Sequence, residues 1–256
     1  MNVRDRGNRE RRLLLHLLLR SVLSVHLATA LLGCAVTNQQ TRPANSIASP
    51  RPSVSSETNE RSTDRIDRQT TNPYSGSLSI FEDPKRADRL QVDRVMDVLG
   101  IKPGSSVADV GAGSGWFTVK AAKRVGSGGL VYAVEINIEY LKHIAKRARE
   151  ENLSNVRTIL GKEDDPLLPE KGVDAVLLLK TYHEIGEPVR WLRRMRSSMR
   201  EGALLGIIDR TGKGDDHGID RETVVKEAQR GGFMLVEQHD FVRPDEVDYF
   251  LVFRAR

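Results

Sequence analysis

A glycine-rich run in the middle of the chain has the residue types of a ligand-binding turn. An aspartate is followed by glycines at alternate positions with an alanine between two of them: Asp109, Gly111, Ala112, Gly113 and Gly115. Such glycines let the backbone bend sharply and approach a ligand, because no Cβ stands in the way. In the dinucleotide pattern G-x-G-x-x-G the third glycine would come one residue later, where this chain has Trp116. The run therefore favours a different ligand, and Asp109 would attract an ammonium group and repel a pyrophosphate.

Polar side chains also stand where four further apolar stretches end. Three of them are followed by Glu135, by Glu163 and Asp164, and by Lys180, Thr181, Tyr182 and His183. The fourth ends at Asp209 and Arg210, and the polar loop that follows holds His217. Because the carboxyl ends of parallel strands meet at one edge of a sheet, these groups are expected to surround the ligand.

Metal binding and disulfide chemistry find little support in the sequence. Asp215, Asp216 and His217 could bind a metal together with His183, but no paired ligand spacing is present, and we expect no metal. The chain has one cysteine, which excludes an intramolecular disulfide framework and a cysteine-based zinc site.

Short apolar stretches alternate with helical patterns from Phe81 onward, and they must position these side chains. Strands are predicted at 106–110, 130–134, 156–160, 173–179, 203–208, 233–240 and 249–253, and helices at 87–99, 116–125, 138–149, 188–199 and 219–230. Apolar strands that are each followed by a helix indicate a parallel sheet covered on both faces. The last two strands have only a short connection, so the final one should run antiparallel to its neighbour. The prediction is an α/β, Rossmann-like doubly wound sheet of seven strands, mostly parallel, preceded by a disordered N-terminal tail.

The run D-V-G-A-G-S-G resembles the first motif of class I S-adenosylmethionine-dependent methyltransferases. The resemblance extends over roughly Phe81 to Phe253. It implies a methyltransferase that binds S-adenosylmethionine through the residues of this run, Asp109, Gly111, Ala112, Gly113 and Gly115. In that family an acid at the position of Glu135 accepts hydrogen bonds from both ribose hydroxyls, which suits a carboxylate because it only accepts.

The same resemblance assigns roles to the ends of the third and fourth strands. The family often has an aspartate directly after the glycine that matches Gly161, to meet the adenine amino group. This chain has Lys162 there, which leaves Glu163 or Asp164 for that role. Lys180 and Thr181 would line the cofactor pocket. Tyr182 and His183 would face the substrate, in a pattern similar to that of methyltransferases of uncertain substrate.

The activated methyl group leaves the protein two tasks, to position a nucleophile in line with it and to exclude water. If the nucleophile carries a proton, His183 or Tyr182 could act as the general base, and His217 is a third candidate. Two other functions stay open. One is a nicotinamide-dependent oxidoreductase on a Rossmann sheet, and the other is a non-catalytic, membrane-tethered binding module that keeps the methyltransferase fold.

The N-terminal region reads as a leader and a linker. Residues 1–34 begin with arginines and continue into an apolar stretch that ends at Cys34, which resembles a bacterial lipoprotein processing site. Residues 35–78 are polar, with almost no large hydrophobics, and we expect a disordered linker. The domain then covers residues 79–256. A lipidated Cys34 would anchor the protein to the bacterial envelope, away from the cytoplasm where the cofactor is made, so a cytoplasmic location is the alternative.

The charge distribution bears on partners. The chain carries a formal charge of +5, and residues 1–75 hold eleven arginines and six acids, so residues 76–256 hold 29 basic and 29 acidic residues. A neutral folded part argues against nucleic acid as a partner. We expect a monomer that acts on a small molecule, a lipid or a protein side chain.

Overall fold

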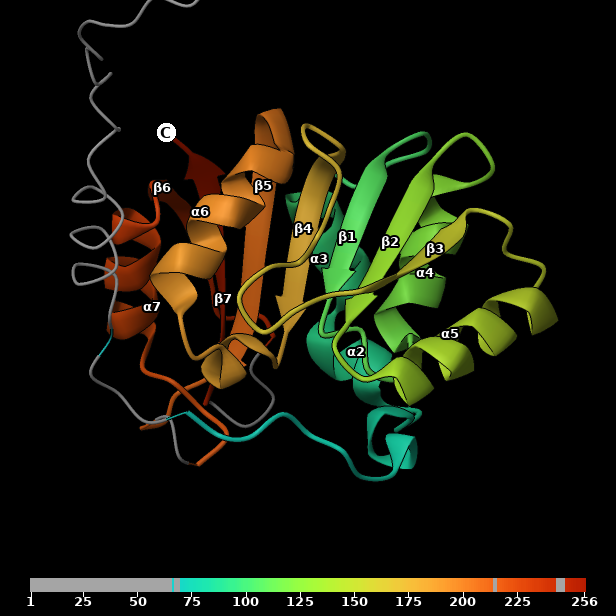
Figure 1. Cartoon of the computed structure of the whole chain (residues 1–256), viewed down its shortest axis with the longest axis horizontal. Coiled ribbons are helices and arrows are strands. Elements are labelled where there is room, and N and C mark those ends of the chain that lie inside the picture. Colours follow the sequence, from blue (N-terminus) through green and yellow to red (C-terminus); the bar gives the residue numbers. More distant parts are fainter. Residues whose placement is uncertain (1–65, 67–69, 214–215, 243–246) are drawn as a thin grey trace, which may run out of the picture. The chain divides into compact units, whose positions relative to one another are not determined.

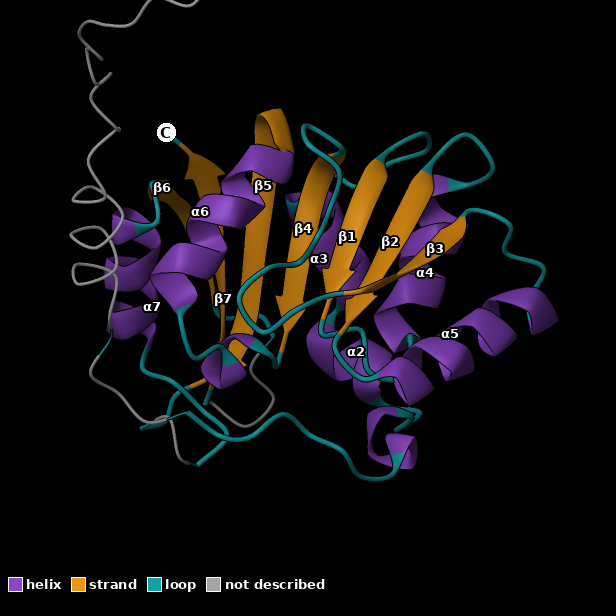
Figure 2. Ribbon diagram, in the orientation of Figure 1, coloured by secondary structure: helices purple, strands orange, loops and turns teal. Residues whose placement is uncertain are grey.

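The computed structural model describes residue 66 and residues 70–213, 216–242 and 247–256. They form a sheet with helices on both of its faces (Figure 1, Figure 2). The strands are β1 Ser106–Val110, β2 Leu130–Glu135, β3 Val156–Leu160, β4 Val173–Leu179, β5 Met199–Arg210, β6 Phe233–His239 and β7 Asp248–Ala255. The α-helices are α2 Arg86–Leu90, α3 Val92–Val98, α4 Trp116–Val125, α5 Ile138–Glu150, α6 Pro188–Ser198 and α7 Arg221–Arg230, and η2 Leu78–Phe81 and η3 Tyr182–Glu184 are short 3-10 helices.

The strand order confirms the predicted doubly wound sheet. Seven strands lie in the order β3-β2-β1-β4-β5-β7-β6. Strands β1 to β5 are parallel, and β7 runs antiparallel between β5 and β6, as the short last connection predicts. The chain leaves β1 toward β2 on one side and returns to β4 on the other. The loops after β1 and β4 therefore diverge, and the crevice between them is where ligands of such sheets bind.

Two apolar clusters hold the layers together, one on each face of the sheet. Alternate residues of each central strand point to opposite faces, so Val107 and Ala108 of β1 belong to different clusters. One cluster packs the sheet against α6 and α7 through residues such as Trp191. The other packs it against α3 and α4 through residues such as Phe117. Burial on both faces explains why the central strands are nearly continuous in Val, Leu and Ile.

The single helix predicted at 87–99 is wrong, because the chain breaks it into α2 and α3. Gln91 between them has φ +46° in the left-handed region. Leu90 and Val92 are both buried, although residues two apart point to nearly opposite sides of one continuous helix. The break reorients the chain so that both side chains reach the core.

The last residues of the predicted linker, 70–78, contact the folded unit. We call residues 70–81 the N-terminal strap, and Figure 1 shows it crossing beneath the carboxyl ends of the strands. The Tyr140 hydroxyl donates to the Gly76 carbonyl at 2.8 Å, and the rings of Tyr74 and Phe81 pack edge to face with centroids 5.6 Å apart. The Tyr140 contact comes from a side chain far along the chain, so the polar composition of the segment did not reveal it.

The predicted leader and most of the linker, including Cys34, lie outside the described residues. Within the described part of the chain, no helix combines the length and the apolar composition that crossing a bilayer requires.

Candidate functional site

A large pocket opens at the carboxyl ends of β1, β2 and β4, under the N-terminal strap. Its volume is about 950 Å³. It is lined by predicted site residues, namely Asp109, Gly111, Ala112, Gly113, Glu135, Glu163, Asp164, Lys180, Thr181, His183 and His217. Two predicted residues, Gly115 and Tyr182, do not line it. The structure thus brings most of the predicted groups into one cavity.

The glycine-rich run forms the tight bend that its sequence predicts. Gly111 and Gly113 have φ of +68° and +54°, which residues with a Cβ adopt only with strain. A Cβ on Gly111 would overlap the Thr181 side chain, and one on Gly113 would lie 3.3 Å from the Phe81 ring. The bend therefore brings bare backbone to the pocket wall, close to β4 and the strap.

Gly115 has a packing role and, unlike Gly111 and Gly113, does not line the pocket. Its φ is +74°, and a Cβ there would lie 3.0 Å from Cγ1 of Ile144 on α5. Its N–H donates to the Ala112 carbonyl at 2.8 Å, which closes the turn before α4. The glycine is needed because α5 packs closely against this turn, outside the pocket.

Glu135 at the end of β2 is fixed by three backbone N–H groups. Its Oε2 accepts from Gly113 at 3.0 Å, and its Oε1 accepts from Ile136 at 2.8 Å and Asn137 at 3.2 Å. A carboxylate offers about four lone-pair positions, so it retains capacity for a ligand donor. This buried acid ties the glycine bend to β2 and presents an acceptor to the pocket.

Asp109 is a buried carboxylate in the floor of the pocket. It accepts a 2.6 Å hydrogen bond from the Thr118 hydroxyl. Burial raises its pKa to about 6, although the Thr118 hydrogen bond and the charge of Arg86 favour the ionised form. Near neutral pH the group is a poorly solvated anion, which would gain from a bound cation.

The two acids after β3 have different surroundings. The Asp164 carboxylate pairs with Arg194 at 2.9 Å and Arg190 at 3.4 Å, both on α6. Among the described residues, the Glu163 carboxylate forms no ion pair with a lysine or an arginine. Of the two acids left open by the sequence, Glu163 is therefore the better candidate for the adenine role.

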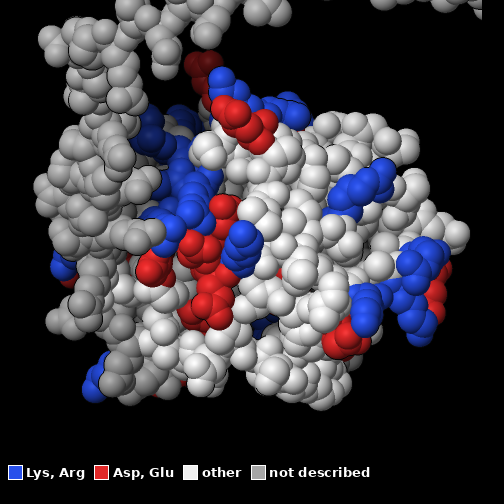
Figure 3. Space-filling view, in the orientation of Figure 1, with Lys and Arg blue, Asp and Glu red and all other residues white. Residues whose placement is uncertain are grey.

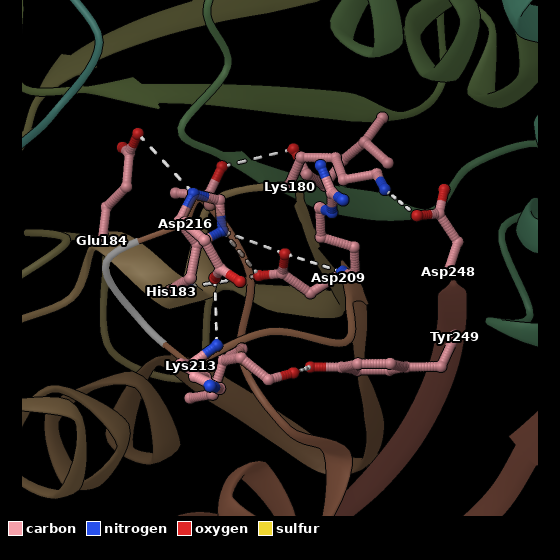
Figure 4. A network of polar contacts seen from close by, with 12 residues as sticks. Lys180, His183, Glu184, Asp209, Lys213, Asp216, Asp248 and Tyr249 are labelled. Atoms are coloured by element: carbon pink, nitrogen blue, oxygen red, sulfur yellow. Dashed lines mark hydrogen bonds and ion pairs between the residues drawn. The ribbon is translucent and has the colours of Figure 1, made fainter. Parts of the chain in front are cut away.

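The end of β4 carries Lys180 and Thr181. Lys180 has φ +58°, and its N–H donates to the Ile208 carbonyl at 2.7 Å. Its ammonium group forms an ion pair with Asp248 of β7 (Figure 4). Thr181 packs against Gly111. Both residues line the pocket. The ammonium group of Lys180 is, however, already paired with the carboxylate of Asp248 on β7.

Tyr182 does not face the substrate side, which corrects its assignment as a candidate base. Its side chain is fully buried, and its hydroxyl donates to Glu227 of α7 at 2.9 Å. The 3-10 turn of η3 places Tyr182 and His183 on different sides. Tyr182 belongs to the core beneath α7, and His183 lines the pocket.

His183 is held by Asp209 at the end of β5. Its Nδ1 lies 2.9 Å and 3.1 Å from the two Asp209 oxygens, and its backbone N–H donates to Oδ2 at 3.2 Å. A carboxylate only accepts, so in the neutral ring the proton is on Nδ1 and the lone pair is on Nε2. Asp209 is fully buried and fixes the orientation of the ring.

Two further ionisable groups adjoin His183, as Figure 4 shows for Glu184. A Glu184 oxygen lies 3.9 Å from Nε2 of His183, and the ring centroids of His183 and His217 are 5.9 Å apart. Burial raises the pKa of the Glu184 carboxyl to about 7, although the His183 ring and the Tyr74 N–H favour its ionised form. One potential ligand atom from each of the three side chains lies within 4.8 Å of the others. The sequence indicated His183 and His217 as possible joint ligands, together with Asp215 and Asp216, but it did not indicate Glu184.

Several pocket residues were missed by sequence reasoning. Tyr74 and Phe81 of the strap line the pocket, and their aromatic character in a polar segment was a usable signal. Arg86 also lines it, donates to the Phe81 carbonyl at 2.9 Å and stacks 4.6 Å from the Trp116 ring centroid. Nothing in the sequence distinguishes Arg86 from the other arginines.

Comparison with known proteins agrees with this geometry. Residues 107–202 match the family model of a methyltransferase domain. A solved structure of an S-adenosylmethionine-dependent methyltransferase from Aquifex aeolicus superposes with a TM-score of 0.63 at 24% identity, covering 69% of this chain and 95% of that one. The fold is the Rossmann-like methyltransferase fold.

Two curated relatives match parts of the chain. A nocamycin O-methyltransferase of Saccharothrix syringae is 36% identical over 83 residues, which are 32% of this chain and 30% of the relative. A protein-L-isoaspartate O-methyltransferase of Pyrococcus horikoshii is 34% identical over 96 residues, 37% of this chain and 42% of the relative. The chain thus spans less than half the length of either relative.

Proposed function

We propose that the protein is a methyltransferase that uses S-adenosylmethionine and acts on an oxygen of a small-molecule acceptor. The observation that carries the proposal is the joined pair of Gly113 and Glu135. The bend presents bare backbone to the pocket, and the carboxylate bound to it still has acceptor capacity. The match of residues 107–202 to a methyltransferase domain and the O-methyltransferase relatives support the activity and the oxygen acceptor.

The residues present fit the cofactor. When bound, S-adenosylmethionine supplies a methyl group that is already activated by its positive sulfur. Glu135 would accept hydrogen bonds from the ribose hydroxyls, and Glu163 would meet the adenine amino group. Asp109 would face the positively charged amino acid part, and Arg86 beside it would attract the carboxylate. The aromatic rings of the N-terminal strap would exclude water from this half of the pocket.

The acceptor would bind next to His183. Asp209 contacts Nδ1, so Nε2 is the ring nitrogen that would take the proton of an acceptor hydroxyl. The buried Asp209 would stabilise the imidazolium that results, as the aspartate does in other His–Asp pairs. Tyr182 has no part in this step because its hydroxyl is bound to Glu227.

Calorimetric titration with S-adenosylhomocysteine, with NADH as the competing ligand class, tests the proposal. We expect binding of S-adenosylhomocysteine and none of NADH. Glu135→Ala should weaken binding at least tenfold, since charged hydrogen bonds are worth about 1.5–3 kcal/mol each. Glu150→Gln, an exposed acid on α5, is the control and should bind as the wild type does. Binding of NADH alone would favour the oxidoreductase.

Methyl transfer itself requires a second measurement. Tritium transfer from labelled S-adenosylmethionine to a panel of hydroxylated small molecules should give turnover that His183→Ala reduces. Cofactor binding without any turnover on such acceptors would favour the non-catalytic module.

We also propose, on the sequence alone, that Cys34 is lipidated and tethers the domain to a membrane. Mass spectrometry of the N-terminal peptide from cells would detect the lipid. An unmodified Cys34 in a chain that still begins at Met1 would favour the cytoplasmic location.

A further inference from the structure

Two imidazoles and a carboxylate converge in the acceptor half of the pocket. His183 and Glu184 come from η3, and His217 comes from the loop before α7. One potential ligand atom of each lies within 4.8 Å of the others, and all three residues line the pocket. We propose that His183, Glu184 and His217 bind one divalent transition-metal ion.

The donor set fits such an ion. Two histidines with one carboxylate bind Zn²⁺ in catalytic sites and Fe²⁺ in oxygenases, and both arrangements leave coordination positions open. Ligand atoms that share one ion at about 2.1 Å lie roughly 3–3.5 Å apart. The three side chains would therefore close by about 1 Å. His217 is exposed, so rotation of its side chain can supply this movement.

Asp209 is an independent observation that points to a cation. Histidine ligands of metals almost always donate their other ring nitrogen to a carboxylate or carbonyl, which fixes the ring and makes it a better ligand. The Nδ1 of His183 makes this contact with Asp209 at 2.9 Å, and Asp209 is itself fixed by the Arg210 N–H at 2.9 Å. Nε2 is thereby directed toward Glu184, 3.9 Å away.

Another histidine and acid pair in the described residues lacks these features. His239 and Glu237 of β6 approach to 2.9 Å, but the Glu237 side chain is half exposed. Among the described residues, the ligand atoms of His183, Glu184 and His217 lie close enough together to share one ion. His239 and Glu237 do not belong to such a group of three. The pair on β6 therefore serves as a natural control.

If the protein is a methyltransferase, as proposed above, a metal ion at this site would favour a particular class of methyl acceptor. An ion with two open positions suits an acceptor hydroxyl that has a second oxygen on the neighbouring carbon, because both oxygens can bind. A hydroxyl bound to a divalent ion loses its proton to water more readily. When the ion is bound, Nε2 of His183 is one of its ligands and cannot also take a proton from the acceptor. Proton uptake by His183 and activation of the acceptor by the metal are therefore alternative mechanisms, and measuring whether the protein binds a metal distinguishes them.

Metal binding can be measured without any assay of activity. The full chain is freed of metal with a chelator and titrated with Zn²⁺ by calorimetry, and with Co²⁺ by visible absorption. We expect one ion per chain with micromolar or tighter affinity, and Co²⁺ bands typical of nitrogen and oxygen ligands. His217→Ala and Glu184→Gln should each weaken binding at least tenfold. His239→Ala and His143→Ala should bind as the wild type does.

The outcomes separate this proposal from the proposed function. His217 is exposed, so its replacement should leave the circular dichroism spectrum unchanged. Uptake of less than a tenth of an equivalent overturns the metal site, as does binding that persists unchanged in both cluster variants. Either result leaves cofactor binding standing. Loss of cofactor binding in a chain that still takes up the ion would overturn the proposed function alone.

Discussion

Asp109 illustrates how a single buried carboxylate can serve binding at the expense of stability. It is 2% exposed, and its pKa of about 6 means that the native state holds its proton more tightly than the unfolded chain does. Ionising this group in the empty pocket therefore costs free energy. A cofactor with a positive charge would recover that cost on binding, which couples occupancy of the pocket to stability.

The pH dependence of stability tests this account. Because the pKa is raised from 3.8 to about 6, the contribution of Asp109 is present at low pH and is lost as the pH rises through about 6. Two pKa units correspond to about 3 kcal/mol. Asp109→Asn should lack this loss, so its unfolding free energy relative to wild type should rise between pH 4 and pH 7. Urea unfolding across this range measures it.

Asp174→Asn is the control, because Asp174 binds Ser106 and Arg200 at the opposite end of the sheet. Asp109→Asn should also bind S-adenosylhomocysteine at least tenfold more weakly at pH 7.5. A variant that keeps the wild-type pH profile would show that Asp109 is not the group that titrates.

At the scale of elements, the glycine bend and the end of β4 form one unit. Gly111 has φ +68°, and the space where its Cβ would lie is filled by Thr181. Gly100 has nearly the same φ, +66°, but no atom lies within 4 Å of its Cβ position. An alanine at Gly100 would therefore suffer backbone strain alone, whereas an alanine at Gly111 would suffer the same strain and a steric overlap with Thr181.

Gly100→Ala should cost about 1–2 kcal/mol, the strain of a left-handed alanine. Gly111→Ala should cost roughly 1–3 kcal/mol more, because it also overpacks the pocket wall. Thr181→Ala in the Gly111→Ala background should recover part of the extra loss. Denaturant unfolding of the four proteins gives the values, and equal losses for the two glycine variants would disprove the crowding.

The N-terminal strap is the second element that shapes the pocket. Tyr140→Phe removes the hydrogen bond to the Gly76 carbonyl and keeps the ring. One such bond contributes about 1 kcal/mol, so S-adenosylhomocysteine affinity should fall about fivefold with little change in melting temperature. Tyr132→Phe on β2, outside the pocket lining, is the control. Unchanged affinity in Tyr140→Phe would mean that the strap does not cover the ligand.

The elements that the sequence predicts well are those with strong periodicity. The helix at 116–125 and the strands at 106–110, 156–160 and 173–179 have the predicted bounds. The break at Gln91 and the strap depend on contacts with distant residues, which a local pattern does not contain. The site residues likewise divide into those that the sequence reveals and those that depend on tertiary contacts. The residue types after each strand are visible in the sequence, but the side that Tyr182 faces and the approach of His217 to Glu184 follow from tertiary packing.

At the scale of the whole molecule, charge separates the folded part from the N-terminal region. Residues 76–256 hold equal numbers of acids and bases, and on the face shown in Figure 3 many of them lie side by side. Arg190 and Arg194 of α6, for example, pair with Asp164. The net charge of +5 thus belongs to residues 1–75.

Retention on heparin should follow this division. The full chain should bind a heparin column at low salt and elute early in a salt gradient, because its arginine-rich region is attracted to polyanions. A fragment of residues 70–256 should flow through, with a circular dichroism spectrum that confirms folding. Retention of the fragment would reveal a basic surface on the folded part and would reopen nucleic acid as a partner.

The position of β7 has a consequence for biosynthesis. Ribosomes deliver the strands in numerical order, yet among the strands that the structure describes β6 pairs with β7 alone, and β7 lies between β6 and β5. Nascent chains must therefore hold β5 and β6 apart until residues 248–255 leave the exit tunnel. Lys180 receives its partner Asp248 at that same moment. A product cut short by these few residues would keep every motif of the pocket and still be an incomplete, aggregation-prone sheet, so cellular proteases should remove it.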